Sequence, residues 1–239
     1  MELGLGLLHS GFEGAELGLA FDGVADRCFA VDEKGGLVSP SALAAIVSIR
    51  EIDRVKALGE TNITVLHNLL TSKVVEERIA EAGATPVRTK VGHSLIKEQM
   101  AQTGAVFGGE HSAHYYFRDF WGADNGMLAA LHLISELGTF QGSMSELSNS
   151  FSPYFSSGEI NSTVSDVPAA IDRLKKAFPD CSVEHFDGYT FSLGDKENWF
   201  WFNVRSSNTE PLLRLNVESN HEASMEKIRD QAISVIRNG

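Results

Sequence analysis

The chain has 239 residues, 43% of them hydrophobic and 22% charged, with a formal net charge of -12, as is typical of a folded globular protein with room for two domains. The negative charge and the lack of a dense Lys/Arg block exclude nucleic acids and anionic lipid surfaces as expected partners. An anionic small molecule would need a few basic groups in a cleft, and the candidates are Arg27, Lys90, Lys97, Arg118 and Arg205.

We expect no targeting signal in the first residues. Residues 1–8 are apolar but include Glu2 and no basic segment, so a secretory leader is not expected. No apolar run approaches the roughly 18 residues of a membrane span. Cys28 and Cys181 lie far apart in the sequence, which argues against a disulfide framework or a thiolate metal site. We therefore expect a cytoplasmic chain without a membrane partner.

Two short strands are predicted near the start of the chain, at 17–21 and 28–31, with a polar turn at 22–27 between them. A good helix start follows, because Ser39 can act as a cap and the next residue is a proline. This start predicts a helix over 40–52 and the beginning of a new structural unit.

Strands and helices alternate between residues 63 and 137. Gly83 and Gly104 stand just past two of the expected helix ends and support them. The last helix places Met127, Leu131 and Ile134 on one side at helical spacing. The alternation predicts a layered α/β domain. The predicted strands are 63–66, 85–88 and 105–107, and the predicted helices are 73–82, 94–103 and 125–137.

A histidine stands at the start of one of these helices. His93 follows Val91 and Gly92, between a predicted strand and a predicted helix. Imidazole titrates near neutrality, so His93 could exchange a proton with a substrate hydroxyl. A lone histidine is more often a cap or a surface residue, and the residues alone leave both interpretations open.

The loop from Gly108 to His114 follows the next predicted strand. Glu110 and Ser112 lie two residues apart, so the carboxylate could accept a hydrogen bond from one sugar hydroxyl while the serine donates to its neighbour. A polar loop with its glutamate in water is the more common meaning of an isolated Glu-x-Ser pattern.

Residues 148–158 are rich in Ser, Asn, Pro and Gly, which marks a boundary. Several consecutive strands with flanking helices follow, and they predict a smaller α+β domain. The predicted strands are 159–164, 182–186, 190–193, 199–204 and 212–218, and the predicted helices are 167–177 and 222–237.

The segment from Arg205 to Pro211 lies between the last two of these strands. A guanidinium, several hydroxyls, an amide and backbone N–H groups stand within seven residues, as a site for phosphate oxygens requires. A polar hairpin turn accounts for the same composition equally well.

These segments, in this order, resemble the α-D-phosphohexomutase superfamily of phosphomannomutases and phosphoglucomutases. Arg205 to Pro211 resembles its phosphate-binding loop, Gly108 to His114 its sugar-binding loop, and Val91 to His93 the segment whose histidine faces the reacting centre. The resemblance covers nearly the whole chain. It implies a mixed αβ domain of the phosphoglucomutase type followed by a smaller α+β C-terminal domain.

The resemblance also assigns roles to residues. Glu110 and Ser112 would hold ring hydroxyls, while His93, His114 and Arg27 would act at the reacting centre. The phosphate would be bound by Arg205, Ser207, Asn208 and Thr209.

The turn from Asp22 to Arg27 resembles the Mg²⁺ loop of this family, Asp-Gly-Asp-x-Asp-Arg. The middle position here is Val24, which offers no ligand, so only Asp22 and Asp26 remain. Because Mg²⁺ requires several oxygen ligands, we expect metal binding to be weak or absent. An Asp-capped turn without metal is an equally good interpretation.

The family has four domains, and the resemblance divides this chain among three of them. Residues 1–36 would be the tail of the second domain, 37–150 the third, and 151–239 the C-terminal phosphate-binding domain. The serine loop of the first domain, Thr-x-Ser-His-Asn-Pro in pattern, has no match in the sequence. Since that serine is the phosphoryl donor, we expect the chain alone to be inactive without a serine-loop domain.

The expected function is thus that of the C-terminal part of a phosphohexomutase, which interconverts hexose 6-phosphate and hexose 1-phosphate. Two alternatives stay open. The chain could be a non-catalytic sugar-phosphate-binding module or degenerate relative, or a subunit completed by a separate chain. A truncated second domain would expose strand edges and apolar surface, so a homo-oligomer is a further expectation.

Overall fold

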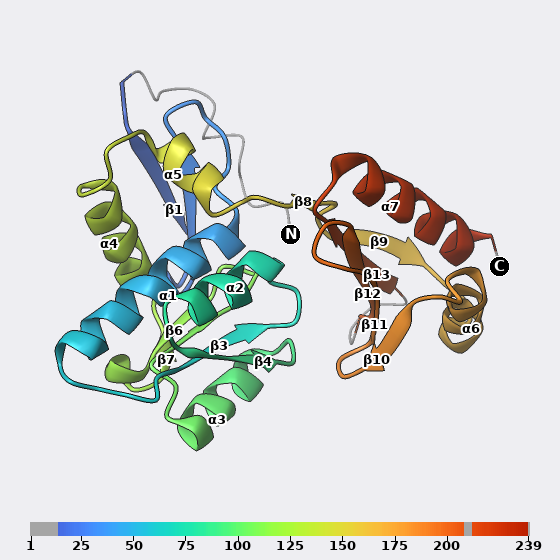
Figure 1. Ribbon diagram of the computed structural model, residues 1–239, viewed down its shortest axis with the longest axis horizontal. Helices are drawn as coiled ribbons and strands as arrows, with labels where there is room; N and C mark the ends of the chain where they lie inside the picture. Colours follow the sequence, from blue (N-terminus) through green and yellow to red (C-terminus); the bar gives the residue numbers. More distant parts are fainter. Residues whose placement is uncertain (1–13, 208–211, 239) are drawn as a thin grey trace. The chain divides into compact units, whose positions relative to one another are not determined.

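The computed structural model describes residues 14–207 and 212–238, and the chain divides into two compact units, residues 1–153 and 154–239. Figure 1 shows the elements of each. Asn208 and Thr209, both predicted phosphate ligands, lie outside the described residues. We describe each unit by itself, as unit 1 and unit 2.

Unit 1 begins with an antiparallel hairpin, β1 (Leu17–Phe21) and β2 (Cys28–Asp32), in which Phe21 pairs with Cys28. The connecting turn reverses the chain sharply, because Ala25 has a positive φ of 58° and its N–H donates to the Asp22 carbonyl at 3.1 Å. Both strands were predicted from the sequence.

The main sheet of unit 1 has five strands in the order β4-β3-β5-β6-β7. β3 is parallel to both of its neighbours, and the antiparallel strands β6 and β7 extend the sheet beyond β5. The sequence predicted the three parallel strands but not β6 and β7. The strands are β3 (Thr64–Asn68), β4 (Thr85–Thr89), β5 (Phe107–Gly109), β6 (Tyr115–Phe117) and β7 (Ala123–Asp124).

Helices cover both faces of this sheet, with α1 and α2 on one side and α3 on the other (Figure 1). Two successive glycines in β5 allow both layers to approach closely. A Cβ on Gly108 would meet Ile96 of α3 at 3.0 Å, and a Cβ on Gly109 would meet Ala44 of α1 at 2.8 Å. Because successive strand residues face opposite sides, β5 is in contact with both helices. The helices are α1 (Pro40–Ala57), α2 (Lys73–Glu81), α3 (His93–Thr103), α4 (Gly126–Leu137), α5 (Met144–Ser150) and the 3₁₀ turn η2 (Arg118–Phe120).

Two helices of unit 1 differ from their predictions. α1 begins at Pro40 as expected, although the Ser39 side chain makes no capping hydrogen bond. The helix continues five residues beyond the predicted end, because Val55 still packs in the core and is fully buried. In α4, the predicted apolar side is exposed, with Leu131 61% accessible, and the helix packs instead through small residues and Leu133.

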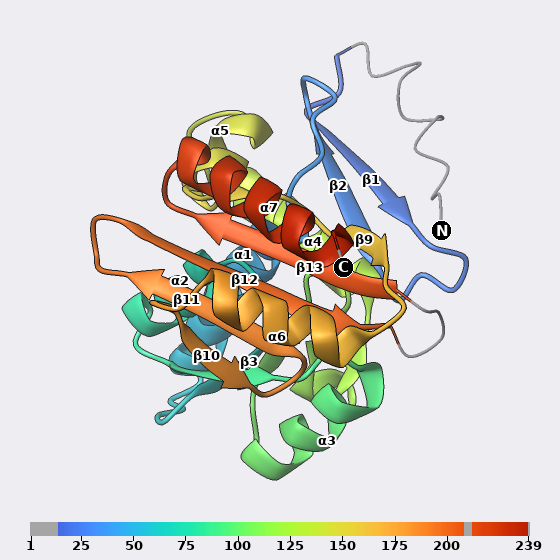
Figure 2. The same ribbon diagram turned by 90° about the vertical axis from the view of Figure 1, so that its right-hand side faces the viewer.

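Unit 2 is an antiparallel sheet in the order β10-β11-β12-β13-β8, with β9 also paired to β13. α6 and α7 lie side by side over one face (Figure 2). Their apolar sides form the core with strand residues such as Phe191, Phe202 and Leu215. The elements are β8 (Phe155–Ser156), β9 (Ile160–Thr163), α6 (Val167–Ala177), β10 (Ser182–His185), β11 (Tyr189–Gly194), β12 (Trp199–Ser206), β13 (Leu212–Ser219) and α7 (Glu222–Arg237).

The fold class follows the prediction, with a mixed αβ unit followed by a smaller α+β unit. Among the described helices, none has the length and apolarity needed to cross a bilayer.

Candidate active site

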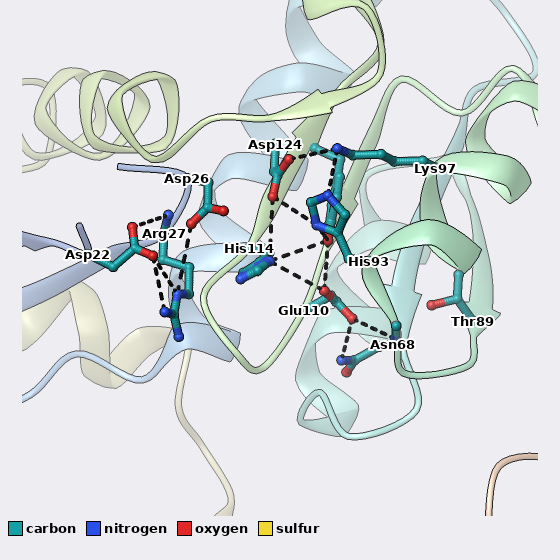
Figure 3. Close-up of polar contacts among 12 residues, drawn as sticks. Asp22, Asp26, Arg27, Asn68, Thr89, His93, Lys97, Glu110, His114 and Asp124 are labelled. Atoms are coloured by element: carbon teal, nitrogen blue, oxygen red, sulfur yellow. Dashed lines mark hydrogen bonds and ion pairs between the residues drawn. The ribbon is translucent and has the colours of Figure 1, made fainter. Parts of the chain in front are cut away.

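Two loops far apart in the sequence are held together in unit 1. Arg27 and His114 form an antiparallel bridge, and the Cys28 N–H donates to the Ala113 carbonyl at 3.3 Å. On the other side of the turn, the Gly126 N–H donates to the Ala25 carbonyl at 3.2 Å. The turn at 22–27 and the loop that ends at His114 are therefore neighbours, as Figure 3 shows.

Glu110 lies at the centre of this site and is only 3% exposed. Its carboxylate accepts hydrogen bonds from the Tyr116 hydroxyl at 2.9 Å, from the Asn68 amide at 3.3 Å and from the Gly92 N–H at 3.5 Å. The interpretation of a glutamate pointing into water is therefore wrong. Folding itself orients this carboxylate, since its partners come from β6, β3 and the start of α3.

Tyr116 links Glu110 to both predicted histidines, and the sequence did not predict it as a site residue. Its hydroxyl oxygen lies 3.2 Å from His93 Nδ1 and 3.5 Å from His114 Nδ1. Burial, with the negative charge of Glu110, raises the pKa of Tyr116 well above its ordinary value. The phenol therefore stays protonated and donates to Glu110, while its oxygen can accept a hydrogen bond from an imidazole N–H.

His114 is largely buried, and burial lowers its pKa, although the carboxylates of Glu110 and Asp124 oppose that effect. The ring is therefore neutral near pH 7 and can accept a proton from a hydroxyl group. Its Nδ1 lies 3.5 Å from Asp124 Oδ2 and 3.9 Å from Glu110 Oε2.

His93 is the first residue of α3 and belongs to a second group of charges. Its Nδ1 lies 3.1 Å from Asp124 Oδ2, and its Nε2 lies 2.8 Å from Lys97 Nζ. Lys97 also pairs with Asp124 Oδ1 at 3.0 Å. The sequence predicted Lys97 only as a general basic candidate and did not predict Asp124. Asp124 pairs with Tyr116 across β6 and β7, so the two side chains share a face of the sheet.

Ser112 and Arg118 complete the placement of the unit 1 candidates. Ser112 is exposed at the tip of a tight turn in which Ala113 has a φ of 68°. Arg118 does not join the site, because its guanidinium donates to the Glu60 carboxylate at 2.6 and 2.8 Å. The prediction that Arg118 binds an anionic ligand is therefore wrong.

The turn at 22–27 shows some features of a cation site. Arg27 Nε donates to Asp22 Oδ2 at 3.1 Å. Burial alone would raise the pKa of Asp22, but hydrogen bonds, above all from the Arg27 backbone N–H, lower it. Burial and the neighbouring Asp22 raise the pKa of Asp26, whose Oδ1 is buried without a hydrogen-bond partner among the described residues. This oxygen has an ion-pair contact with Arg27 Nε at 3.9 Å, and a cation also fits beside it, but Val24 is 78% exposed and supplies no ligand.

In unit 2, Arg205 lies at the end of β12, directly opposite Arg214 of β13. Arg214, which the sequence analysis did not predict, contacts Glu159 and Ser207, both at 3.5 Å. Within the described part of the chain, the Nε atoms of both arginines are buried without a hydrogen-bond partner. Like charges directly opposite each other destabilise a sheet, and an anion beside them would relieve that repulsion.

Comparison with known proteins identifies both units. Residues 40–154 match the family described as phosphoglucomutase/phosphomannomutase, alpha/beta/alpha domain III, and residues 159–235 match its C-terminal domain. A phosphomannomutase of Methanocaldococcus jannaschii is 39% identical over 216 residues, which are 90% of this chain and 46% of that protein. A phosphomannomutase of Salmonella montevideo is 38% identical over 230 residues, 94% of this chain and 48% of that protein.

A crystal structure gives the same result. A phosphoglucomutase/phosphomannomutase family protein from Burkholderia thailandensis superimposes with a TM-score of 0.78 at 26% identity, over 97% of this chain and 49% of that one. The chain spans about half the length of the curated relatives it matches. The chain belongs to the α-D-phosphohexomutase superfamily and corresponds to the C-terminal portion of its members.

Proposed function

We propose that this chain is the sugar- and phosphate-binding part of a phosphohexomutase, an isomerase that interconverts hexose 6-phosphate and hexose 1-phosphate. The observation that supports the proposal most strongly is the buried Glu110 carboxylate, which is joined through Tyr116 to two histidines. The names of the relatives, phosphomannomutase and phosphohexose mutase, agree with it. A cytoplasmic setting fits a phosphorylated hexose as ligand.

In this proposal, unit 1 binds the sugar ring. Glu110 accepts hydrogen bonds from ring hydroxyls, and the exposed Ser112 donates one. The neutral His114 accepts the proton of the hydroxyl that is to receive a phosphoryl group, and His93 orients the same hydroxyl. Arg27, next to His114 in the bridge, faces the transferring phosphate.

Unit 2 holds the phosphate that does not react. Arg205 and Ser207 bind its oxygens together with Asn208 and Thr209, and Arg214 adds a second positive charge. These groups contribute by positioning the substrate and neutralising its charge, and they form no covalent bond with it.

A Mg²⁺ ion would be held by Asp22 and Asp26, weakly because Val24 replaces a carboxylate. When bound, the ion would supply positive charge to the transferring phosphoryl group. The proposal requires a phosphorylated serine from a serine-loop domain, since no serine here stands in such a loop. We propose that these 239 residues alone bind the sugar phosphate but do not turn it over.

The exposed Val24 favours one alternative, a degenerate relative that binds sugar phosphates without catalysis. Both proposals require the same binding site, so only turnover separates them. A serine-loop domain from a related phosphomannomutase, added in trans, would restore turnover in the first case and would fail to do so in the second.

Calorimetric titration with glucose 1,6-bisphosphate tests the binding site. Glu110→Gln removes a charged acceptor and should weaken binding by about 1.5–3 kcal/mol, roughly 10- to 150-fold. Arg205→Ala should cost about 2–5 kcal/mol, because it removes one of the two guanidiniums that pair with the phosphate charge. Glu76→Gln, at an exposed position of α2, is the matched control and should bind like the parent. Unchanged heats in both site variants would overturn the proposal.

A further inference from the structure

Two imidazoles and a carboxylate in unit 1 lie at distances that suit a metal ion. One nitrogen each of His93 and His114 and one oxygen of Asp124 all lie within 4.8 Å of one another. Asp124 Oδ2 is 3.1 Å from His93 Nδ1 and 3.5 Å from His114 Nδ1. In a tetrahedral zinc site with bonds of about 2.0 Å, neighbouring ligand atoms are about 3.3 Å apart. Two of the three separations therefore already match such a site.

The two carboxylate oxygens of Asp124 lie in different environments, since Oδ1 pairs with Lys97 Nζ at 3.0 Å. The Asp124 side chain is 6% exposed, and Oδ2 has no hydrogen-bond partner among the described residues despite the two nearby imidazoles. A buried carboxylate oxygen without a partner is costly. A cation between Oδ2 and the two Nδ1 atoms would satisfy all three.

The Tyr116 hydroxyl lies next to both histidines of this group. Its oxygen lies 3.2 and 3.5 Å from the same two Nδ1 atoms, close to the spacing expected between tetrahedral ligands. Glu110 accepts the Tyr116 proton at 2.9 Å and fixes the orientation of that hydroxyl, in the way outer groups orient metal ligands. The Tyr116 hydroxyl is therefore a neighbour of both nitrogens that the ion would use.

We propose that His93, His114 and Asp124 bind a late first-row divalent ion such as Zn²⁺ or Co²⁺. Two imidazole nitrogens favour such ions over Mg²⁺, which prefers oxygen ligands and belongs to the Asp22 and Asp26 turn if it binds at all. The ion would occupy the nitrogens that handle protons in the proposed function, so it would inhibit turnover. Only that consequence rests on the proposed function.

Lys97 opposes metal binding in two ways. Its Nζ lies 2.8 Å from His93 Nε2, and Nε2 can accept from an ammonium only when the ring proton is on Nδ1, the atom the metal needs. Its charge is also 3.0 Å from Asp124 Oδ1 and repels a cation. The site is therefore weakened by its own lysine, and removing that lysine should strengthen it.

Titration of the whole chain with Co²⁺, followed by visible absorption, tests the proposal without any sugar phosphate. A single tetrahedral site should give d–d bands that saturate and that Zn²⁺ abolishes. Asp124→Asn and His114→Gln should each weaken binding by at least about tenfold. Lys97→Met should tighten it by roughly tenfold, since a positive charge a few Å from the ion is removed. His185→Gln, an exposed histidine of unit 2, is the control and should change nothing.

Circular dichroism of each variant distinguishes loss of Co²⁺ binding from loss of the fold. Equal Co²⁺ affinity in all variants would show an adventitious ion only, and would overturn the proposal. Weaker or unchanged binding in Lys97→Met would also overturn it, even if Asp124→Asn failed to fold. Because no sugar phosphate is present, failure here is separate from failure of the proposed function.

Discussion

The two units hold their polar site residues in opposite ways. In unit 1, Glu110 is buried and already accepts hydrogen bonds from three partners in the same unit. In unit 2, Arg205 and Arg214 face each other with buried Nε atoms that have no partner in the described chain. The first site is completed by folding, whereas the second keeps buried Nε–H donors that are available to an anion.

The difference arises from topology. In unit 1, the carboxyl ends of the parallel strands β3 and β5 meet at one edge, and ligands bind α/β sheets at such edges. Asn68 and Glu110 therefore meet next to the first turn of α3. In unit 2, an antiparallel hairpin places Arg205 opposite Arg214, so that register alone brings two like charges together.

The largest expected effect is a loss of unit 1 stability at acidic pH. His67 is buried beside the unit 1 site, and burial, with the charge of Arg88, lowers its pKa from 6.5 to about 4. The folded state therefore favours the neutral His67 imidazole over the protonated one. The stability that this preference contributes is fully present above pH 6.5, and about 3 kcal/mol of it is lost as the pH falls to 4. Urea unfolding from pH 7 to 4 should show this loss, and His67→Gln should reduce the slope. Parallel pH profiles would contradict the assignment.

The next effect tests whether site residues stabilise unit 1. Glu110→Ala leaves the Tyr116 hydroxyl and the Asn68 amide without their acceptor, which should cost about 2 kcal/mol of unfolding free energy. Chemical denaturation measures this cost. Glu76→Ala, at an exposed position of α2, provides the reference. Equal stability of the two variants would mean that folding does not depend on the site network.

A smaller effect is expected at the turn in unit 1 that lacks a ligand. Val24→Asp adds a carboxylate at an exposed position and should tighten Mg²⁺ binding by about tenfold, since affinity follows the charge and number of ligands. Calorimetry with Mg²⁺ gives the constant, and Val183→Asp in unit 2 controls for added charge. If both variants bind Mg²⁺ alike, the turn is not a metal loop.

The smallest effect has the opposite sign and belongs to unit 2. Arg205→Met removes the charge opposite Arg214, so it should stabilise unit 2 by about 0.5 kcal/mol while it weakens phosphate binding. Hydrogen exchange of the β13 amides reports on this unit, with Arg229→Met as the control. Faster exchange in Arg205→Met would show that Arg205 stabilises the sheet in the absence of an anion.

The sequence predicted the helices of unit 2 well, because periodicity and caps define them. α6 and α7 have the predicted limits, and Asp166 caps α6 through the Ala169 N–H at 2.9 Å. β6 and β7 have three and two residues, too few to show alternation. α5 was not predicted, although Ser143 and Glu146 form a capping box at its start; only its last three residues fall in the predicted boundary at 148–158.

The site was predicted in part for a similar reason. The patterns around His93 and Glu110 are local in sequence, and the structure brings both residues into one group with His114. Tyr116 resembles an ordinary core aromatic, and Asp124 resembles a turn residue before a capping asparagine. The pairing of β6 with β7 puts these two side chains on one face of the sheet, and their contacts with Glu110 and the histidines then show that they belong to the site.

The central claim is that the unit 1 histidines contact a phosphorylated hexose. Nitrogen-detected histidine NMR during titration with glucose 1,6-bisphosphate measures this contact directly. The resonances of His93 and His114 should shift and saturate, while those of the exposed His185 and His221 should stay in place. Saturating ligand that leaves His93 and His114 unmoved would contradict the account.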